Sequence, residues 1–366
     1  MPYRSVSPAT SRADPNSMPL RIESFTAGGP RAGDFAAVRE AMVYPAPDDE
    51  PATGAECLVA YDAGRPVARL AMVAAPELHG APGPSGLVGW YEALDGEAGA
   101  ALLVRARETL AERGAARVLG PMNGSTWKRY RMALPPEPCE PAPTPFLTEP
   151  VNPPEYPAHF LAAGFTVAAE YESRVAGRRV GDSYGPVTGA RGADGIRTGP
   201  LDPAHFDDTL REIYELSLRA FAENLYYTPI AFADFAAAYL KIRPLLDPEL
   251  VRLARGADGR LLAFVFAFPD PFDRVPDLPF ATAEEAGEEP EPRGLRVVLK
   301  TLATDPEARG MGLGGRLSAE VHHVAFARRA PSVIHALMQV DNSSTHISGR
   351  LRGEPFRRYA LFGWTP

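Results

Sequence analysis

The stretch "LATDPEARGMGLGGRL", residues 302–317, contains four glycines within the seven residues 309–315. An apolar run, "GLRVVLKTLA" (294–303), precedes the cluster, and an amphipathic run, "RLSAEVHHVAFARRA" (316–330), follows it. The two runs predict a strand and a helix. Because glycine has no side chain and readily adopts positive φ, the cluster predicts a loop that another molecule approaches closely.

Two motifs overlap in this loop. Gly310, Gly312 and Gly315 spell G-x-G-x-x-G, the pattern of dinucleotide-binding loops. Arg309, Gly312 and Gly314 spell R-x-x-G-x-G, the pattern of a coenzyme A loop. Either motif would place a pyrophosphate at a helix N-terminus, where converging N–H groups and the helix dipole attract anions. The cluster alone therefore indicates a phosphate-containing cofactor and leaves its identity open.

Two segments of the chain share one order of predicted elements, β-α-β-β-β-α-β-α-β. The first runs from "LRIESFTAG" to "TVAAEYESRV", with a hairpin turn at residues 62–64. The second runs from "GIRTGPL" to "FRRYALFGW", with a hairpin turn at residues 258–259. We predict an α/β protein of the α+β type with two tandem units. Each unit is a mixed, mostly antiparallel sheet flanked by helices.

This layout disfavours the dinucleotide interpretation. The dinucleotide fingerprint normally begins at the end of its strand, whereas "TDPEAR" (304–309) intervenes here. A doubly wound fold also needs further parallel strands, and only about one strand-length of chain follows Asp341. An acidic residue such as Asp341 could still reach a ribose. A NAD(P)-dependent oxidoreductase therefore stays the less favoured alternative.

The coenzyme A interpretation fits the whole layout. Residues 302–317 resemble the pyrophosphate loop of the GNAT (Gcn5-related N-acetyltransferase) superfamily, which has a strand, an Asp-Pro turn, Arg/Gln-x-x-Gly-x-Gly/Ala and a helix. The resemblance covers residues 196–366 and, more weakly, the first segment. "PMNGSTW", "FAENLYYTP" and "GEPFRRYAL" look like stretches of tandem GNAT proteins. The resemblance implies two tandem GNAT-like domains and acetyl-CoA (coenzyme A) as co-substrate.

We expect four parts in the chain. They are a disordered N-terminal arm (1–18), a degenerate GNAT-like domain (19–180), a linker (181–195) and a GNAT domain with the acyl-CoA site (196–366). At the position of the glycine loop the first domain reads "EALDGEAGAALLV", where Asp95 and Glu97 would repel a pyrophosphate. We expect this domain to support the second one. Its "GPMNGSTWKRY" segment (120–130) either lines the acceptor pocket or forms a plain turn with Trp127 packed on the core.

The resemblance also implies which residues hold the cofactor. Backbone N–H groups around residues 302–304 would polarise the thioester carbonyl like an oxyanion hole. Asn342 would contact the pantetheine arm or order the end of a strand. The predicted cofactor-binding residues are Leu302, Ala303, Thr304, Arg309, Gly310, Met311, Gly312, Leu313, Gly314, Gly315 and Asn342.

The acid and the base are less clearly marked. Where the family has a tyrosine that protonates the leaving thiolate, this chain has Gly349. Tyr359, the nearest tyrosine, is either the acid or a tyrosine on a sheet face. Glu223 either relays the proton of the acceptor or is a solvated carboxylate at a helix end. The same "FAENLYYTP" segment holds the predicted acceptor-binding residues Asn224, Tyr226 and Tyr227.

Bulk composition excludes several functions. The formal net charge of −8 argues against nucleic acid or an anionic membrane as a partner. No apolar run approaches the roughly 18 residues of a membrane span. Cys57 and Cys139 make no disulfide framework, and no Cys/His spacing predicts a metal. We expect a soluble, cytoplasmic protein.

Together these features predict an acyl-CoA-dependent N-acyltransferase that transfers acetyl to the amine of a small molecule. The missing tyrosine favours a different alternative, a non-catalytic acyl-CoA-binding or sensor protein.

Overall fold

The structure, a computed structural model, describes residues 20–42, 50–75, 77–136, 144–178, 195–274 and 294–366. The arm predicted at 1–18 and nearly all of the linker predicted at 181–195 lie outside these residues. We call residues 20–178 the N-terminal unit and residues 195–366 the C-terminal unit. The predicted domain borders themselves stay a prediction.

The N-terminal unit follows the predicted order of elements, with the two-residue strand β6 in addition. Its strands are β1 (Arg21–Thr26), β2 (Glu56–Asp62), β3 (Arg65–Ala75), β4 (Ser85–Ala93), β5 (Arg117–Gly120), β6 (Met132–Ala133) and β7 (Thr166–Gly177). Its helices are α1 (Ala32–Glu40), α2 (Gly96–Glu112) and α3 (Tyr156–Ala162). The β2–β3 hairpin turns at Ala63 and Gly64, both with positive φ, which matches the twist of paired strands.

The C-terminal unit repeats this order with one additional helix. Its strands are β8 (Arg197–Pro200), β9 (Val251–Arg255), β10 (Leu261–Pro269), β11 (Val297–Thr304), β12 (Ser332–Gln339) and β13 (Glu354–Trp364). Its helices are α4 (Phe206–Phe221), α5 (Phe232–Ile242), α6 (Leu313–Ala327) and α7 (Ser343–Arg350). We did not predict α5, which packs through Phe235 and Tyr239. No helix among the described residues is long and apolar enough to cross a membrane.

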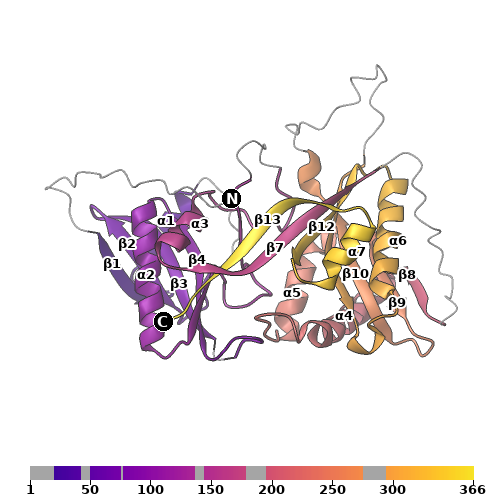
Figure 1. The fold of residues 1–366 in the computed structure, drawn as a ribbon, viewed down its shortest axis with the longest axis horizontal. Helices are drawn as coiled ribbons and strands as arrows, with labels where there is room; N and C mark the ends of the chain where they lie inside the picture. The colour runs from indigo at the N-terminus through magenta and orange to yellow at the C-terminus, as the bar shows by residue number, and fades with distance from the viewer. Residues whose placement is uncertain (1–19, 43–49, 76, 137–143, 179–194, 275–293) are drawn as a thin grey trace, which may run out of the picture.

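The last strand of each unit pairs with the other unit. The strand order is β1-β2-β3-β4-β5-β13-β7-β12-β11-β10-β9-β8, so β13 lies beside β5 and β7 lies beside β12. Figure 1 shows β7 and β13 crossing the middle of the molecule side by side. The single sheet is mostly antiparallel, as predicted. Its parallel pairs are β4–β5 and β11–β12.

Helices cover both faces of each half of the sheet. In the N-terminal unit α2 and α3 pack on one face, and Phe35 of α1 packs on the other. In the C-terminal unit α6 covers one face. The other face is covered by α4 and α5, and Phe146 of the N-terminal unit joins that core. The glycine loop joins the end of β11 to the start of α6, the helix that covers one face of this half of the sheet.

We predict that Phe362→Ala destabilises the N-terminal unit although Phe362 lies near the C-terminus. Its side chain is 1% exposed and packs against Phe160 of α3, with ring centroids 5.4 Å apart. The free energy of unfolding should fall by about 3–5 kcal/mol in urea titrations. Hydrogen exchange should accelerate in β5. The control Phe356→Ala removes a partly buried ring of the same strand on the other core. If hydrogen exchange in β5 stayed slow in Phe362→Ala, the pairing of β13 with the N-terminal unit would be contradicted.

A buried pair of histidines joins α6, β12 and α7. The Nε2 atoms of His322 and His335 lie 2.7 Å apart, and Nδ1 of His335 lies 2.6 Å from the Ser348 hydroxyl. Burial lowers the pKa of His335 to about 4. Burial also holds the pKa of His322 well below its usual value. Both rings are therefore neutral in the folded protein at neutral pH.

This pair predicts loss of stability on mild acidification. An unfolded histidine takes up a proton near pH 6.5, whereas folded His335 stays neutral until about pH 4. The unfolded state therefore binds more protons across this window, and stability falls by up to about 1.4 kcal/mol per pH unit and histidine. Urea titrations between pH 7.5 and 4.5 would measure the slope. His335→Gln should flatten it, whereas exposed His346→Gln should not.

Candidate active site

The chain passes from β11 to the glycines through a fixed turn. Asp305 accepts the N–H of Glu307 (3.1 Å) at the start of the Pro306–Ala308 turn. Its buried carboxylate also lies 3.0 Å from Arg219 and 2.9 Å from Arg260. Burial would raise the pKa of Asp305, but these hydrogen bonds together lower it. The carboxylate is therefore ionised, and it anchors the entry to the loop.

The glycines leave open space at the N-terminus of α6. Gly310 and Gly312 have φ of +86° and +73°, a region that favours glycine. A Cβ atom at Gly310, Gly312 or Gly315 would meet no atom within 4 Å. At Gly314 a Cβ would come within 3.2–3.3 Å of side chains of α7 and β11. Gly314 thus allows close packing of the helix, and the other three border open space.

Backbone donors point into this space. The first helical hydrogen bond of α6 runs from the N–H of Arg316 to the carbonyl of Gly312 (3.0 Å). No side chain caps the helix. Within the described ranges, the N–H groups of Leu313, Gly314 and Gly315 have no acceptor. Three free donors at the positive end of a helix dipole suit a phosphate group.

The N-terminal unit is closed at the corresponding position. Asp95 caps α2, and its carboxylate accepts the N–H of Ala98 (2.7 Å). A Cβ at Gly96 would lie 3.0 Å from the ring of His159, and one at Gly99 would lie 2.3 Å from the Tyr91 hydroxyl. The start of α2 is thus filled by a carboxylate and tightly packed rings.

The parallel strands β11 and β12 separate early. They pair over three positions, which end at Leu299 and His335. β11 has a bulge at Lys300, because Leu299 and Thr301 face consecutive residues of β10. β12 has its own irregularity, and Leu337 has a φ of +60°. Beyond the last pair the strands diverge and leave a gap, beside which β11 carries the predicted residues 302–304.

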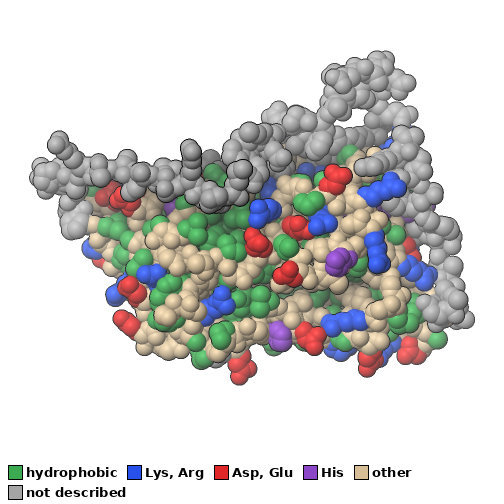
Figure 2. All heavy atoms as spheres, viewed as in Figure 1, with side chains coloured by type: hydrophobic (Ala, Val, Ile, Leu, Met, Phe, Trp, Pro, Cys, Tyr) green, Lys and Arg blue, Asp and Glu red, His purple; other side chains and the backbone are tan. Residues whose placement is uncertain are grey.

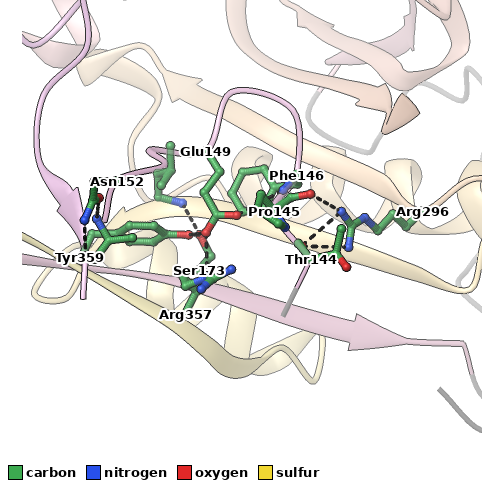
Figure 3. Close-up of polar contacts among 11 residues, drawn as sticks. Thr144, Pro145, Phe146, Glu149, Asn152, Ser173, Arg296, Arg357 and Tyr359 are labelled. Carbon is green, nitrogen blue, oxygen red and sulfur yellow. Dashed lines mark hydrogen bonds and ion pairs between the residues drawn. The ribbon is translucent and has the colours of Figure 1, made fainter. Parts of the chain in front are cut away.

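A chain of hydrogen bonds runs from this gap to the exchanged strands (Figure 3). Arg131 donates to the carbonyl of Leu337 (3.0 Å), and the N–H of Leu337 donates to the Ser173 hydroxyl (3.0 Å). Ser173 lies 3.0 Å from the Tyr359 hydroxyl, which donates to Glu149 (2.6 Å). Because Tyr359 has one proton and gives it to a carboxylate, Ser173 donates to Tyr359. The network joins both units.

Burial controls the ionisation of this network. Burial raises the pKa of Glu149, although Arg357, whose Nε lies 2.8 Å from the carboxylate, opposes the shift. Burial and the neighbouring Glu149 raise the pKa of Tyr359 well above its usual value. Half-buried Lys300 has its pKa lowered to about 7 by burial and by Arg131, against the effect of Glu149. Lys300 therefore changes charge near neutral pH.

The two predicted catalytic residues lie in different places. Tyr359 is fully buried in the network just described. Glu223 is exposed at the end of α4, and its carboxylate lies 3.0 Å from Arg309 at the edge of the glycine loop. Their roles as acid and base stay predictions. The structure brings Glu223 to the glycine loop and Tyr359 to the interface between the two units.

The predicted acceptor-binding segment contacts the N-terminal unit. Tyr226 is buried, and its N–H donates to the carbonyl of His79 (2.7 Å). Tyr227 packs edge-on against Trp127, whose indole N–H donates to the carbonyl of Thr228 (2.8 Å). Trp127 therefore packs on the core of the C-terminal unit. The Tyr227 hydroxyl is buried and has no hydrogen-bond partner among the described residues.

The other two predicted polar residues are exposed or hold a helix. Asn224 is exposed on the same segment. Asn342 caps α7, because its side-chain oxygen accepts the N–H of Ser344 (3.2 Å). Asn342 thus orders the end of β12, one of the two roles that we considered for it.

Residues 210–347 match the model of the acetyltransferase (GNAT) family. The C-terminal unit thus contains a GNAT-family domain. The match lies in the C-terminal unit, which holds the glycine loop. A comparison with curated proteins gave no match.

Solved GNAT structures share the fold. One is a glucosamine N-acetyltransferase region of a fungal multi-domain β-N-acetylglucosaminidase (16% identity, TM-score 0.52), of which this chain covers 38% while 95% of this chain is covered. Another is Eis1 from Mycobacterium abscessus (15% identity, TM-score 0.50, covering 94% of this chain and 73% of Eis1). A third is a GCN5-related N-acetyltransferase from Anabaena variabilis (10% identity, TM-score 0.51, covering 94% of this chain and 72% of that protein). At these identities the likeness concerns the fold alone.

Sequence reasoning missed three charged residues here, two in the network and one, Lys300, beside it. Glu149 lies in a Pro-rich stretch, and Arg131 directly follows the segment that we considered as a pocket wall. Neither position has a local signal. Lys300 did have one, because it is one of only three lysines in the chain and interrupts an otherwise apolar strand. A lone charge at such a position costs free energy unless it has a use.

We predict that Tyr359→Phe destabilises the protein by about 1.5–3 kcal/mol, because a buried carboxylate loses a donor. Urea titration would measure this. Tyr61→Phe is the matched control, since it removes a 2.7 Å hydrogen bond to the partly exposed Asp34 and should cost about 1 kcal/mol or less. A fall in kcat of about 100-fold in folded Tyr359→Phe would support the acid role, and unchanged kcat would contradict it.

Proposed function

We propose that this protein is an acyl-CoA-dependent N-acyltransferase that transfers acetyl from acetyl-CoA to the amine of a small molecule. The observation that carries the proposal is the open, glycine-lined N-terminus of α6 directly after β11. Family membership supports it, because GNAT enzymes generally use acetyl-CoA. Since Asp95 fills the start of α2, we propose one cofactor site, in the C-terminal unit.

In this proposal the loop binds the pyrophosphate of the donor. The free N–H groups of Leu313, Gly314 and Gly315 are its hydrogen-bond donors. Arg309 adds charge at the edge of the loop, where it is about half exposed and paired with Glu223. An ion pair between exposed side chains is weak, so a pyrophosphate can compete with Glu223 for the guanidinium group. Glu223 then holds Arg309 in place before the donor binds.

The gap between β11 and β12 would take the pantetheine arm. Residues 302–304 of β11 border this gap, so their backbone groups are the proposed contacts to the arm and the thioester. Bound acyl-CoA supplies an activated carbonyl carbon. A backbone N–H that donates to the carbonyl oxygen of this group stabilises the charge that develops there on attack by an amine.

The amine acceptor would approach along the face covered by α4 and α5. The buried Tyr227 hydroxyl lacks a partner among the described residues, and buried polar groups normally have one. We assign a polar group of the acceptor to this position. Asn224, exposed on the same segment, is a second contact.

A non-catalytic acyl-CoA sensor is the second candidate. Two observations favour it. The Tyr359 hydroxyl already has two protein partners, Ser173 and Glu149, and Gly349 stands where the family has a tyrosine. This candidate predicts coenzyme A binding without turnover of any amine. A NAD(P) site is not proposed, because β11 has an antiparallel neighbour on one side and the sheet is not doubly wound.

We predict that Gly315→Asp weakens acetyl-CoA binding and preserves folding. An aspartate in the first turn of α6 favours the helix dipole, but its carboxylate occupies the open space and repels a pyrophosphate. Affinity measured by calorimetry should fall by about tenfold or more, the equivalent of 1.4 kcal/mol. The melting temperature without ligand should stay at or above that of the wild type.

Gly315→Ala is the matched control and should retain most of the affinity, since it adds bulk without charge. Thermal shifts with acetyl-CoA, CoA and NAD(P) should respond to the first two alone. Equal acetyl-CoA affinity in Gly315→Asp and the wild type would refute the loop assignment.

A further inference from the structure

A lysine faces the gap between β11 and β12 from the side of α4 and α5. On β11, Val298 and Ala303 pack with α4 and α5, whereas Leu299 and Leu302 pack with α6. Thr301 contacts Tyr239 of α5. Because the bulge inserts one residue between Leu299 and Thr301, Lys300 shares the α4–α5 side with Thr301. No hydrogen bond or ion pair joins Lys300 to another described residue.

An arginine of the N-terminal unit, directly before β6, borders the same gap on the side of β12. Arg131 is 8% exposed and donates to the carbonyl of Leu337 on β12. Its guanidinium group also lies over the rings of Tyr130 and Tyr171, with distances of 4.1 and 4.3 Å to the ring centroids. In the described part of the chain no carboxylate pairs with it. A buried cation without an anion is costly.

The carboxylates on neighbouring segments already have cationic partners. Glu149 is paired with Arg357 (2.8 Å), and Glu172 of β7 is paired with Arg174 (2.6 Å). Asp270, which follows β10, is paired with Arg296 (2.6 Å). These three pairs are neutral. Lys300 and Arg131 therefore leave an excess of positive charge at the gap.

We propose that the amine acceptor carries an anionic oxygen group, a carboxylate, that binds between Lys300 and Arg131. The proposal rests on the proposed function, because it places the acceptor at the gap where the thioester would lie. A carboxylate would pair with both cations. The amine of the same acceptor would then stay within reach of residues 302–304 of β11. The acceptor class is then an amino acid or a related amino carboxylate.

The backbone supports a binding role for this place. Arg131 and Leu337, joined by a hydrogen bond, both have left-handed backbone angles, with φ of +61° and +60°. Such conformations are unfavourable for residues other than glycine, and they gather at ligand-binding sites where the surrounding structure holds them. The hydrogen bonds through Ser173 and Tyr359 supply that support. Arg131 is therefore held in position before any acceptor binds.

Competitive labelling of the lysines tests the proposal without any need for turnover. Reductive methylation at pH 7 followed by mass spectrometry gives a rate for each lysine, and exposed Lys128 and Lys241 serve as internal standards. Sodium acetate at constant ionic strength should slow labelling of Lys300 relative to both standards, by about threefold or more near saturation. Sodium chloride should not. Phosphate as a third arm distinguishes a carboxylate site from a phosphate site.

Arg131→Gln should remove the protection by acetate. Arg328→Gln, a surface variant, should keep it. Labelling of Lys300 that acetate leaves unchanged would overturn the proposal. A Lys300 that the reagent never reaches would also overturn it, since a position closed to formaldehyde is closed to an acceptor.

Matched acceptors test the same site in turnover. Amino acids should have kcat/KM values about tenfold or more above those of their carboxamides, the effect of one lost charge-assisted contact. Lys300→Met should remove this preference by raising KM for the acids, with KM for acetyl-CoA unchanged. Equal rates for acids and amides would overturn the proposal. Failure of the proposed function would give a different result. Acetyl-CoA would then neither bind nor react, while acetate would still protect Lys300 from labelling.

Discussion

β7 leaves the N-terminal unit to pair with β12, and β13 returns from the C-terminal unit to pair with β5. The two strands also pair with each other along most of their length. Without the exchange, each unit would present an open edge whose N–H and C=O groups lack partners. With it, the units form one sheet and cannot separate unless four strand pairings break, those of β13 with β5, β6 and β7 and that of β7 with β12. The relative position of the units is therefore fixed well enough to build a site from both.

The polar network depends on that fixed position. Arg131 and Glu149 come from the N-terminal unit, whereas Tyr359 and the neighbouring Lys300 come from the C-terminal unit. On the face that Figure 2 shows, basic and acidic side chains are interspersed. The two units therefore contribute different parts of the candidate site. One unit carries the open helix N-terminus, and the other contributes charge and aromatic surface beside it.

Local signals predicted the order of elements and the glycine loop, because periodicity, hairpin turns and a helix entry depend on neighbouring residues. The strand exchange was beyond such signals. β7 and β13 are both partly exposed at one end and buried further along, and nothing local decides whether each pairs within its own unit or with the other one. The roles of Glu149 and Arg131 depend on that exchange, so they could not be predicted either. α5 was missed although its sequence is apolar, because we expected the second segment to repeat the first, in which one helix leads to a hairpin.

The exchange also explains why a unit without a cofactor loop keeps the fold. Asp95 and the rings behind it close the start of α2, so the loop function has no counterpart there. Yet loss of β7 would expose the edge of β12 and remove Ser173, which holds the N–H of Leu337. Leu337 would then lose the support for its strained backbone, and with it the carbonyl that positions Arg131. The N-terminal unit is therefore needed to complete the wall of the gap, although the start of its own helix α2 is closed.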